Sequence, residues 1–396
     1  MENWLKKTFH LDHVIVASLT IITIELMVAI TINLDFLSPV VRSLKSFSMT
    51  DIYYKILNSD EPTDVCSSIT LVDITELTHR KDIAQVILEI NKMRPSALGI
   101  DIIFEGEESD TEGDELLAEA CLQGNPSKTV LAYKLKNYDE AKQAYQKELH
   151  SFFSMNDGII EGFVNLVDNQ EKSVKRYANK LPYRDTLVYS FPSQISQIVT
   201  NKAINDELMH TINYKPVLLP IIKYNELQDY KDYITGHIVL LGTTEEERDQ
   251  FYTPIGQKSG MEILAYTILS MTECPPVKHA SLWVIILWAL VAGYITNLID
   301  FFLTKRVLGR KSTMMVFISQ SGVYDKAIYF LVMVVITWIS FELYVKFSYF
   351  VDTVLPLATI VLIKEGRLLY VGLLSVLKKK KKEHLVRKSI YANEIK

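Results

Sequence analysis

Three aspartates occupy positions at which an α/β protein commonly places ligand-binding groups. Asp73 and Asp101 each end or follow a short apolar run that is typical of a buried strand, and Asp249 follows a third such run at 238–241. In open α/β sheets, ligands bind outside the carboxyl ends of the strands. Carboxylates brought together there could hold Ca²⁺ or Mg²⁺, which prefer oxygen ligands, or an amine or hydroxyl group. The alternative is that each aspartate caps a helix or fixes a loop.

The polar segment after the third run offers two more features. Thr253 precedes Pro254, which fixes the backbone of a turn, and its hydroxyl is a further candidate ligand-binding group. Gly242-Thr-Thr is similar to a phosphate-cradling turn, but the Walker and GxGxxG spacings are missing and three glutamates follow at once. Their charge would repel a phosphate, so this segment does not predict nucleotide binding.

Motifs for catalysis or metal binding do not occur in the chain. No GxSxG, HExxH or HxH pattern accompanies the eight histidines. Four of these are expected to be solvated or hydrogen-bonded surface residues: His79, His150, His210 and His237. The cysteines show no CxxC spacing, and which two of them could form a disulfide is left open: Cys66, Cys121 and Cys274. We therefore expect no enzyme activity, and the sequence indicates neither a metal site nor a cofactor.

Apolar periodicity predicts the elements that must position the aspartates. Residues 69–73 and 97–104 have the pattern of strands, with a helix over 82–93 between them, and such a βαβ unit predicts parallel pairing of its two strands. The strand at 238–241 is followed by a helix that begins at Gly260. The other expected elements are helices over 115–121, 139–153 and 192–204, and strands over 129–135, 159–166, 183–189 and 211–214. This alternation predicts an α/β domain with a mostly parallel sheet.

Four apolar stretches are long enough to be transmembrane helices, one before this domain and three after it: 13–34, 281–303, 327–345 and 347–364. The domain itself is expected to cover 35–280. Glu25 lies in the middle of the first stretch, where a charge is costly, so we expect a protonated or hydrogen-bonded packing residue, with a transport role as the alternative. Because Gly260 opens the helix that leads toward the second stretch, Gly260 and Glu25 are the candidate signal-coupling residues.

Basic residues predict the orientation of the chain. Lys6 and Lys7 precede the first stretch, a basic cluster lies within 305–311, and a run of lysines follows the last stretch. With four crossings all three sets fall on one side, which should be the cytoplasm. The cytoplasmic parts are then 1–12, 304–326 and the basic tail 365–396, and the domain is extracytoplasmic, in the periplasm of a bacterium whose inner membrane holds the chain. The lysine run consists of Lys378, Lys379, Lys380, Lys381 and Lys382.

This lysine run is expected to bind an anionic membrane surface, with a solvated tail or a site for a cytoplasmic partner as alternatives. The formal net charge of -5 is small, and nothing in its distribution favours nucleic acid as a partner.

Several segments together resemble the CHASE domain of the second type, a sensory domain found outside the cell. They are the segments ITLVD at 69–73, PSALGIDIIF at 95–104, IVLLG at 238–242, DQFYTP at 249–254 and GMEILA at 260–265. The resemblance covers about residues 35–275 and implies one transmembrane helix before the domain and three after it. Family members are associated with adenylate cyclase, histidine kinase, diguanylate cyclase or serine/threonine kinase modules. The residues from 137 to 214 match the family loosely.

The resemblance leads to two expectations of function. The first is a sensor of a small ligand or an envelope protein; the residues after the last stretch are too few for an effector domain, so a separate membrane or cytoplasmic protein would receive the signal. The second is a structural or scaffold subunit of a cell-envelope complex. An outward-facing hydrolase lacks a catalytic constellation, and a transporter would find few polar residues in the four stretches.

Overall fold

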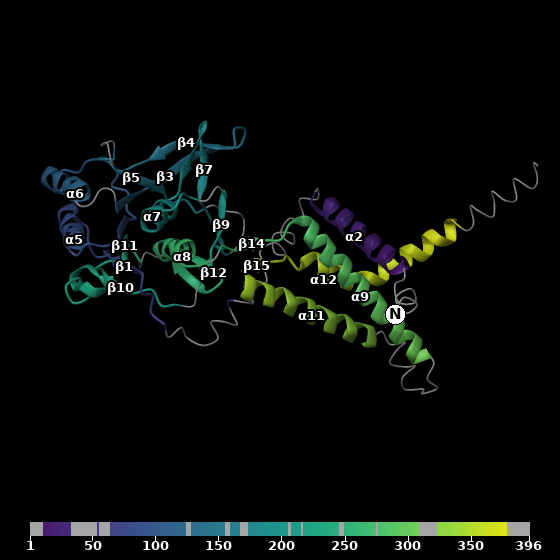
Figure 1. Cartoon of the computed structure of the whole chain (residues 1–396). Helices are drawn as coiled ribbons and strands as arrows, with labels where there is room; N and C mark the ends of the chain where they lie inside the picture. Colours follow the sequence, from purple (N-terminus) through teal and green to yellow (C-terminus); the bar gives the residue numbers. More distant parts are fainter. Residues whose placement is uncertain are drawn as a thin grey trace, which may run out of the picture. The chain divides into compact units, whose positions relative to one another are not determined.

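The computed structural model describes residues 11–32, 54, 64–123, 128–154, 159–166, 173–204, 207–214, 217–244, 249–274, 276–308 and 323–377. The chain divides into two compact units, one formed by Ser46–Val277 and the other by Met1–Lys45 together with Lys278–Lys396 (Figure 1). We call them the globular unit and the membrane unit. The apolar residues near 52–57 also predict a short helix, which falls largely outside the described residues.

The globular unit is built on a nine-stranded sheet with the order β10-β1-β11-β2-β3-β4-β7-β8, in which β5 also pairs with β3. Its strands are β1 (Ile69–Asp73), β2 (Ala97–Ile100), β3 (Thr129–Asp139), β4 (Ala144–Leu149), β5 (Ile160–Phe163), β7 (Lys180–Tyr183), β8 (Thr186–Tyr189), β10 (Ile221–Lys223) and β11 (Ile238–Gly242). The first five strands of this order pair in parallel, and β5 is parallel to β3. The predicted α/β domain with a mostly parallel sheet is therefore confirmed.

Helices cover both faces of the sheet because its strands alternate their apolar side chains between two cores. Val72, Val239 and Leu241 enter one core with α5 (Arg80–Lys92) and α6 (Thr111–Gln123). Leu71 and Leu240 enter the other core with α7 (Phe191–Thr200) and α8 (Gly260–Thr272). Strands buried on both faces read as continuous apolar runs, which is the pattern at 69–73 and 238–242. The result is a three-layer sandwich (Figure 1).

The predicted direct pairing of the strands at 69–73 and 97–104 is wrong. The two strands are parallel, but β11 lies between them and pairs with both. The βαβ unit therefore crosses over one strand position, which is filled by a strand from much later in the chain. A pattern of apolar residues fixes the type of an element, but it does not tell which strand will be its neighbour.

The predicted helix over 139–153 is also wrong, because these residues include the turn and the second strand, β4, of a hairpin whose first strand is β3. β3 and β4 pair antiparallel, and the rings of Tyr138 and Tyr145 meet across them at 5.1 Å. The turn is held by Asp139, whose Oδ1 accepts the backbone N–H groups of Ala141 and Lys142. Gln143 at the end of the turn has a φ of 50°. Aspartate side chains favour such turns over helix interiors.

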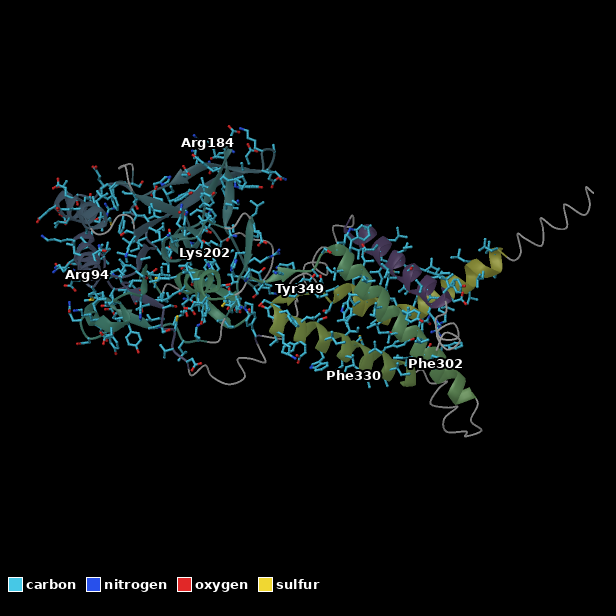
Figure 2. The ribbon with its side chains drawn as sticks, viewed as in Figure 1. Arg94, Arg184, Lys202, Phe302, Phe330 and Tyr349 are labelled. Atoms are coloured by element: carbon cyan, nitrogen blue, oxygen red, sulfur yellow. The ribbon has the colours of Figure 1, made fainter. Side chains whose placement is uncertain are left out.

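The structure also corrects the bounds of two predicted strands. The residues of 183–189 are divided between β7 and β8, which pair as a hairpin whose turn contains Arg184 with a φ of 50° (Figure 2). The expected strand at 211–214 begins earlier, as β9 (Met209–Thr211), and pairs with β6 (Arg176–Ala178). The predicted helix over 192–204 is α7, which ends where Asn201 adopts a left-handed conformation.

The membrane unit contains α2 (Leu11–Ile32), α9 (Leu282–Leu308), α11 (Val323–Phe347) and α12 (Val354–Val361), followed by a further helical stretch over 363–377. Among the described residues, three helices are long and apolar enough to cross a membrane, over Leu11–Ala29, Leu282–Phe302 and Lys326–Phe347. Many of their apolar side chains are exposed, as those of Phe302 and Phe330 are (Figure 2). The predicted fourth helix over 347–364 is not a continuous helix, because β15 (Tyr349–Phe350) and a break at Leu362 interrupt it.

We predict that Gly162→Ala destabilises the globular unit. A Cβ atom at this position of β5 would overlap the backbone N and Cα of Phe191 and lie 2.8 Å from the carbonyl carbon of Ser190. Since the first turn of α7 cannot move away cheaply, we expect a loss of about 2–3 kcal/mol, or roughly 5–10 °C in melting temperature followed by circular dichroism.

The matched control is Gly113→Ala on α6, where the added methyl meets the flexible carboxylate of Asp110. It should change the free energy of unfolding by less than about 0.5 kcal/mol. Equal melting temperatures for the two variants would contradict the close contact between β5 and α7.

Candidate functional site

The carboxyl ends of β1, β11 and β2 lie side by side. Asp73 pairs with Gly242, Leu241 pairs with Ile100, and the backbone N–H of Asp101 donates to the carbonyl oxygen of Leu241 at 2.8 Å. The chain that leaves β1 continues into α5 on one face, whereas the chain that leaves β11 reaches α8 on the opposite face. In α/β proteins, ligands commonly bind at the carboxyl ends of neighbouring strands whose connections part to opposite faces of the sheet. We call this place the β1–β11–β2 edge.

Asp73 fixes the loops of this edge. Its Oδ1 accepts hydrogen bonds from the Thr75 hydroxyl at 2.6 Å and from the backbone N–H of Thr244 at 3.0 Å. The carboxylate is buried, with 5% of its surface exposed. It therefore joins the loop after β1 to the loop after β11, which is the loop-fixing alternative for this aspartate.

Asp249 lies at the start of α8. Its Oδ2 accepts the backbone N–H of Gly260 at 3.1 Å, and a Cβ atom at position 260 would overlap that oxygen. The helix itself is capped by Ser259, whose hydroxyl accepts the N–H of Glu262 while the Glu262 carboxylate accepts the N–H of Ser259. Glycine at 260 is therefore required for the carboxylate to reach the helix terminus. The signal-coupling role of Gly260 stays a prediction.

Asp101 differs from the other two aspartates because no described residue donates a hydrogen bond to its carboxyl group. The side chain is half-buried. Its pKa is raised from the ordinary value of 3.8 to about 7, chiefly by burial and then by the negative charge of Asp249, while Lys134 opposes the rise. A carboxyl group with this pKa is protonated in part at neutral pH and can donate as well as accept a hydrogen bond. Unusual pKa values of this kind are enriched at functional sites.

The three carboxylates do not form one cation site. Among the described parts of the chain, no group of three His, Cys, Asp or Glu side chains is arranged as metal ligands. Thr253 uses its hydroxyl within the turn between β12 (Gln250–Thr253) and β13 (Gly256–Ser259), where it donates to the carbonyl oxygen of Gly256 at 2.7 Å. Ligand binding by Thr253, like that by the aspartates, stays a prediction.

The remaining candidates lie in the membrane unit. Glu25 is exposed on α2 within the first apolar helix, and no contact described for it tests a role in signal coupling. The run from Lys378 to Lys382 lies outside the described residues. Its interaction with the membrane surface stays a prediction.

His150 belongs to a cluster that the sequence analysis missed. Its Nδ1 lies 3.0 Å from Glu161 on β5, its Nε2 lies 3.4 Å from Glu148 on β4, and its ring stacks on Tyr133 of β3 at 4.7 Å. Glu161 raises the pKa of His150, and Glu148 adds to the effect. When it is protonated, the imidazole attracts both carboxylates at the junction of β3, β4 and β5. Glu148 and His150 are two residues apart, a spacing that places side chains on the same face of an extended chain. The wrong prediction of a helix over 139–153 hid this relation.

His210 is likewise not a surface residue. Its Nε2 lies 2.8 Å from the hydroxyl oxygen of Ser270, which also accepts the backbone N–H of Asn213. Burial lowers the pKa of His210 to about 4, so the imidazole is neutral. Because both side chains are buried, with 8% and 2% exposed, this pair joins β9 to α8 and does not resemble an accessible nucleophile.

Asp101→Asn is predicted to stabilise the chain at neutral pH. Its native pKa is raised above the unfolded value, so ionisation of Asp101 costs stability increasingly from pH 3.8 up to about 7. The stabilisation by asparagine should therefore grow over this range and level off above it, at on the order of 2 kcal/mol after allowance for solvent screening. Melting curves between pH 4 and pH 8 measure it. Asp185→Asn, at an exposed turn, is the control for charge; a gain independent of pH would contradict the raised pKa.

His150→Gln should have the opposite pH dependence. The pKa of His150 is raised, so its contribution is fully present below its ordinary value of 6.5 and is lost as the pH rises through the native value. We expect the variant to melt lower than the wild type by roughly 2–4 °C in acid, which corresponds to about 1 kcal/mol, and the difference to vanish in alkali. His79→Gln, at an exposed position, is the control; the same deficit at every pH would contradict the ion-pair assignment.

Comparison with known proteins agrees with this architecture. The CHASE2 domain model matches residues 24–298, which include the whole globular unit, the end of α2 and much of α9. Searches of curated proteins and of solved structures give no significant match. The match covers well over half of the chain, so the resemblance drawn from the five segments is confirmed. The chain belongs to the CHASE2 domain family, whose domain is an extracellular sensory domain.

Proposed function

We propose that this chain is a membrane-anchored sensor whose extracytoplasmic globular unit binds a ligand and passes the signal to a separate protein. The family match over 24–298 carries the proposal, since it joins a sensory domain to apolar helices on both sides. The protein lies in the cytoplasmic membrane of a bacterium, with the globular unit in the periplasm or outside the cell. It acts by binding and not by catalysis.

Contacts within the membrane unit support a topology with four crossings. Asn297, near the end of the apolar part of α9, lies 2.9 Å from His13, near the start of α2. The two helices therefore run antiparallel. At the other end of α9, β14 (Lys278–His279) pairs with β15. Arg367 donates to Asn297, so the chain from β15 to Arg367 runs along most of the apolar length of α9. Residues 354–377 supply the fourth crossing, bent at Leu362.

This topology places both chain ends on one side of the membrane. Basic residues before α2, after α9 and after residue 377 then share the cytoplasmic side, as the distribution of positive charge requires. The lysine run after residue 377 adjoins the anionic inner surface. The globular unit follows α2 and precedes α9 in the chain, and is therefore on the opposite side.

The ligand that suits the β1–β11–β2 edge carries an amine or hydroxyl group. Asp101 is the group with spare hydrogen-bonding capacity there, and Asp249 adds negative charge. A cation held by oxygen ligands alone is less suitable, since no described trio of acidic or histidine side chains is arranged to hold it. α8 begins at this edge, and ten residues after its end the chain enters α9, so a change at the edge has a short path along the chain to the membrane.

The proposal predicts ligand-dependent stabilisation of the full chain in lipid nanodiscs. A panel of small amines, amino acids and polyols would be screened by thermal unfolding. Ligand at about 100 times its Kd stabilises by about 2.7 kcal/mol, which raises the melting temperature by roughly 5–10 °C. Asp101→Asn should remove most of this rise in melting temperature, whereas the control variant Asp185→Asn should show the same rise as the wild type.

Purification from native membranes provides the contradicting outcome. Stoichiometric recovery with envelope proteins, together with no shift for any compound of the panel, would favour a scaffold subunit. A shift that survives in Asp101→Asn would retain the sensor and exclude the β1–β11–β2 edge as its site.

A further inference from the structure

The last helical part of the membrane unit follows a local distortion of the helix at Leu362. α12 ends at Val361, and Leu362 has φ −95° and ψ 12°, which distort the helix locally, while the Leu362 N–H still donates to the carbonyl oxygen of Ala358 at 3.0 Å and its carbonyl oxygen accepts the N–H of Gly366 at 3.2 Å. Residues 363–377 are helical again. A helix bends most readily at a residue where its geometry is already distorted. We call residues 363–377 the arm and Leu362 its hinge.

An ion pair between Arg367, whose side chain is 37% exposed, and the buried carboxylate of Asp300 attaches the arm to α9. The guanidinium of Arg367 contacts the carboxylate of Asp300 at 2.5 Å and donates through Nε to the side-chain oxygen of Asn297 at 3.2 Å. The Asp300 side chain is 5% exposed. Asn297 and Asp300 are three residues apart and thus share one face of α9. Rotation of α9 about its axis would carry both of them away from Arg367 together.

The arm is attached to α2 on its other side. The Tyr370 hydroxyl donates to Asp12 at 2.6 Å. Gly366 lies so close to α2 that a Cβ atom there would overlap the Thr20 hydroxyl and lie 3.0 Å from the carbonyl oxygen of Val16. Arg367, Gly366 and Tyr370 therefore hold the arm through its first two turns. We call these contacts with α2 and α9 the latch.

Beyond the latch the side chains of the arm are exposed, including Leu373 at 49%, Val376 at 52% and Leu377 at 61%. Within the described residues, the direction of the arm is thus set by the hinge and the latch. Release of Arg367 would leave the Asp300 carboxylate, which is 5% exposed, buried without this partner, and that is unfavourable. A contact of this kind favours two discrete states, attached or released, over a gradual loosening.

We propose that the arm is the output element of the sensor, and that release of the latch by movement of α9 is the change delivered to its partner. This inference depends on the proposed function for its biological meaning. The latch itself is a property of the membrane unit and can be tested without a ligand. α9 follows the globular unit directly in the chain, so it is the helix that such movement would reach first.

The test is a distance measurement by pulsed electron paramagnetic resonance on the full chain in nanodiscs. Spin labels would be attached at Ile22→Cys on α2 and Val376→Cys on the arm, both exposed positions, with the native cysteines replaced by alanine. We expect one narrow distance distribution with the latch intact. In Arg367→Gln we expect a shift of about 10 Å or a second population, because the 15-residue arm is about 22 Å long and would swing by about 30°.

Lys346→Gln is the matched control, since it breaks the exposed Lys346–Glu342 pair on α11 and should leave the distribution unchanged. A distribution for Arg367→Gln that superimposes on the wild type overturns the latch while leaving the sensor proposal standing. Where Arg367→Gln fails to fold, Tyr370→Phe replaces it. This variant removes a single hydroxyl contact and should populate the released state in part; an unchanged distribution overturns the proposal equally.

Discussion

The insertion of β11 between β1 and β2 is the constraint on which the globular unit depends. All five residues of this strand are buried, and it supplies parallel hydrogen bonds to a neighbour on each side. Because β1 and β2 precede it in sequence by well over a hundred residues, the central strand pairs depend on contacts between distant parts of the sequence. The same insertion sets Asp73 and Asp101 on either side of Gly242 and starts the connection that brings Asp249 to Gly260. The same three strands, β1, β11 and β2, therefore form both the centre of the sheet and the candidate site.

The three aspartates of that site differ in their hydrogen bonds. Asp73 and Asp249 give their oxygens to backbone N–H groups, which fixes the loop after β11 and the start of α8. Asp101 receives no hydrogen bond from any described residue and bears the cost of burial beside another carboxylate. A residue whose environment disfavours its own charge reduces stability, and such a cost is common where a site is kept ready for a ligand. This difference within one edge is the physical basis for the proposed ligand site and ligand class.

Much of the fold could be predicted from sequence because the central strands are buried on both faces and their apolar runs are unbroken. The helices at α5, α7 and α8 were predicted for the same kind of reason, from apolar side chains at helical spacing. The hairpin of β3 and β4 was not, because polar residues dominate 139–153 and the turn depends on the backbone conformation at Gln143. Neighbour relations, such as β11 beside β1 or Glu161 beside His150, come from long-range contacts that local pattern does not encode. Asp73 and Asp101 lie at the carboxyl ends of β1 and β2, as their sequence positions predict, but the unequal contacts of the three aspartates are seen only in the folded chain.

The account requires that Asp101 holds a proton at neutral pH, and isotope-edited infrared spectroscopy of its carboxyl group tests this most directly. In the full chain in nanodiscs, with Asp101→Asn to assign the band, the protonated carboxyl signal should disappear with a midpoint near pH 7. Asp249→Asn should lower that midpoint, since it removes the neighbouring charge. A midpoint close to the ordinary value of 3.8, unaffected by Asp249→Asn, would contradict the site and the ligand class inferred from it.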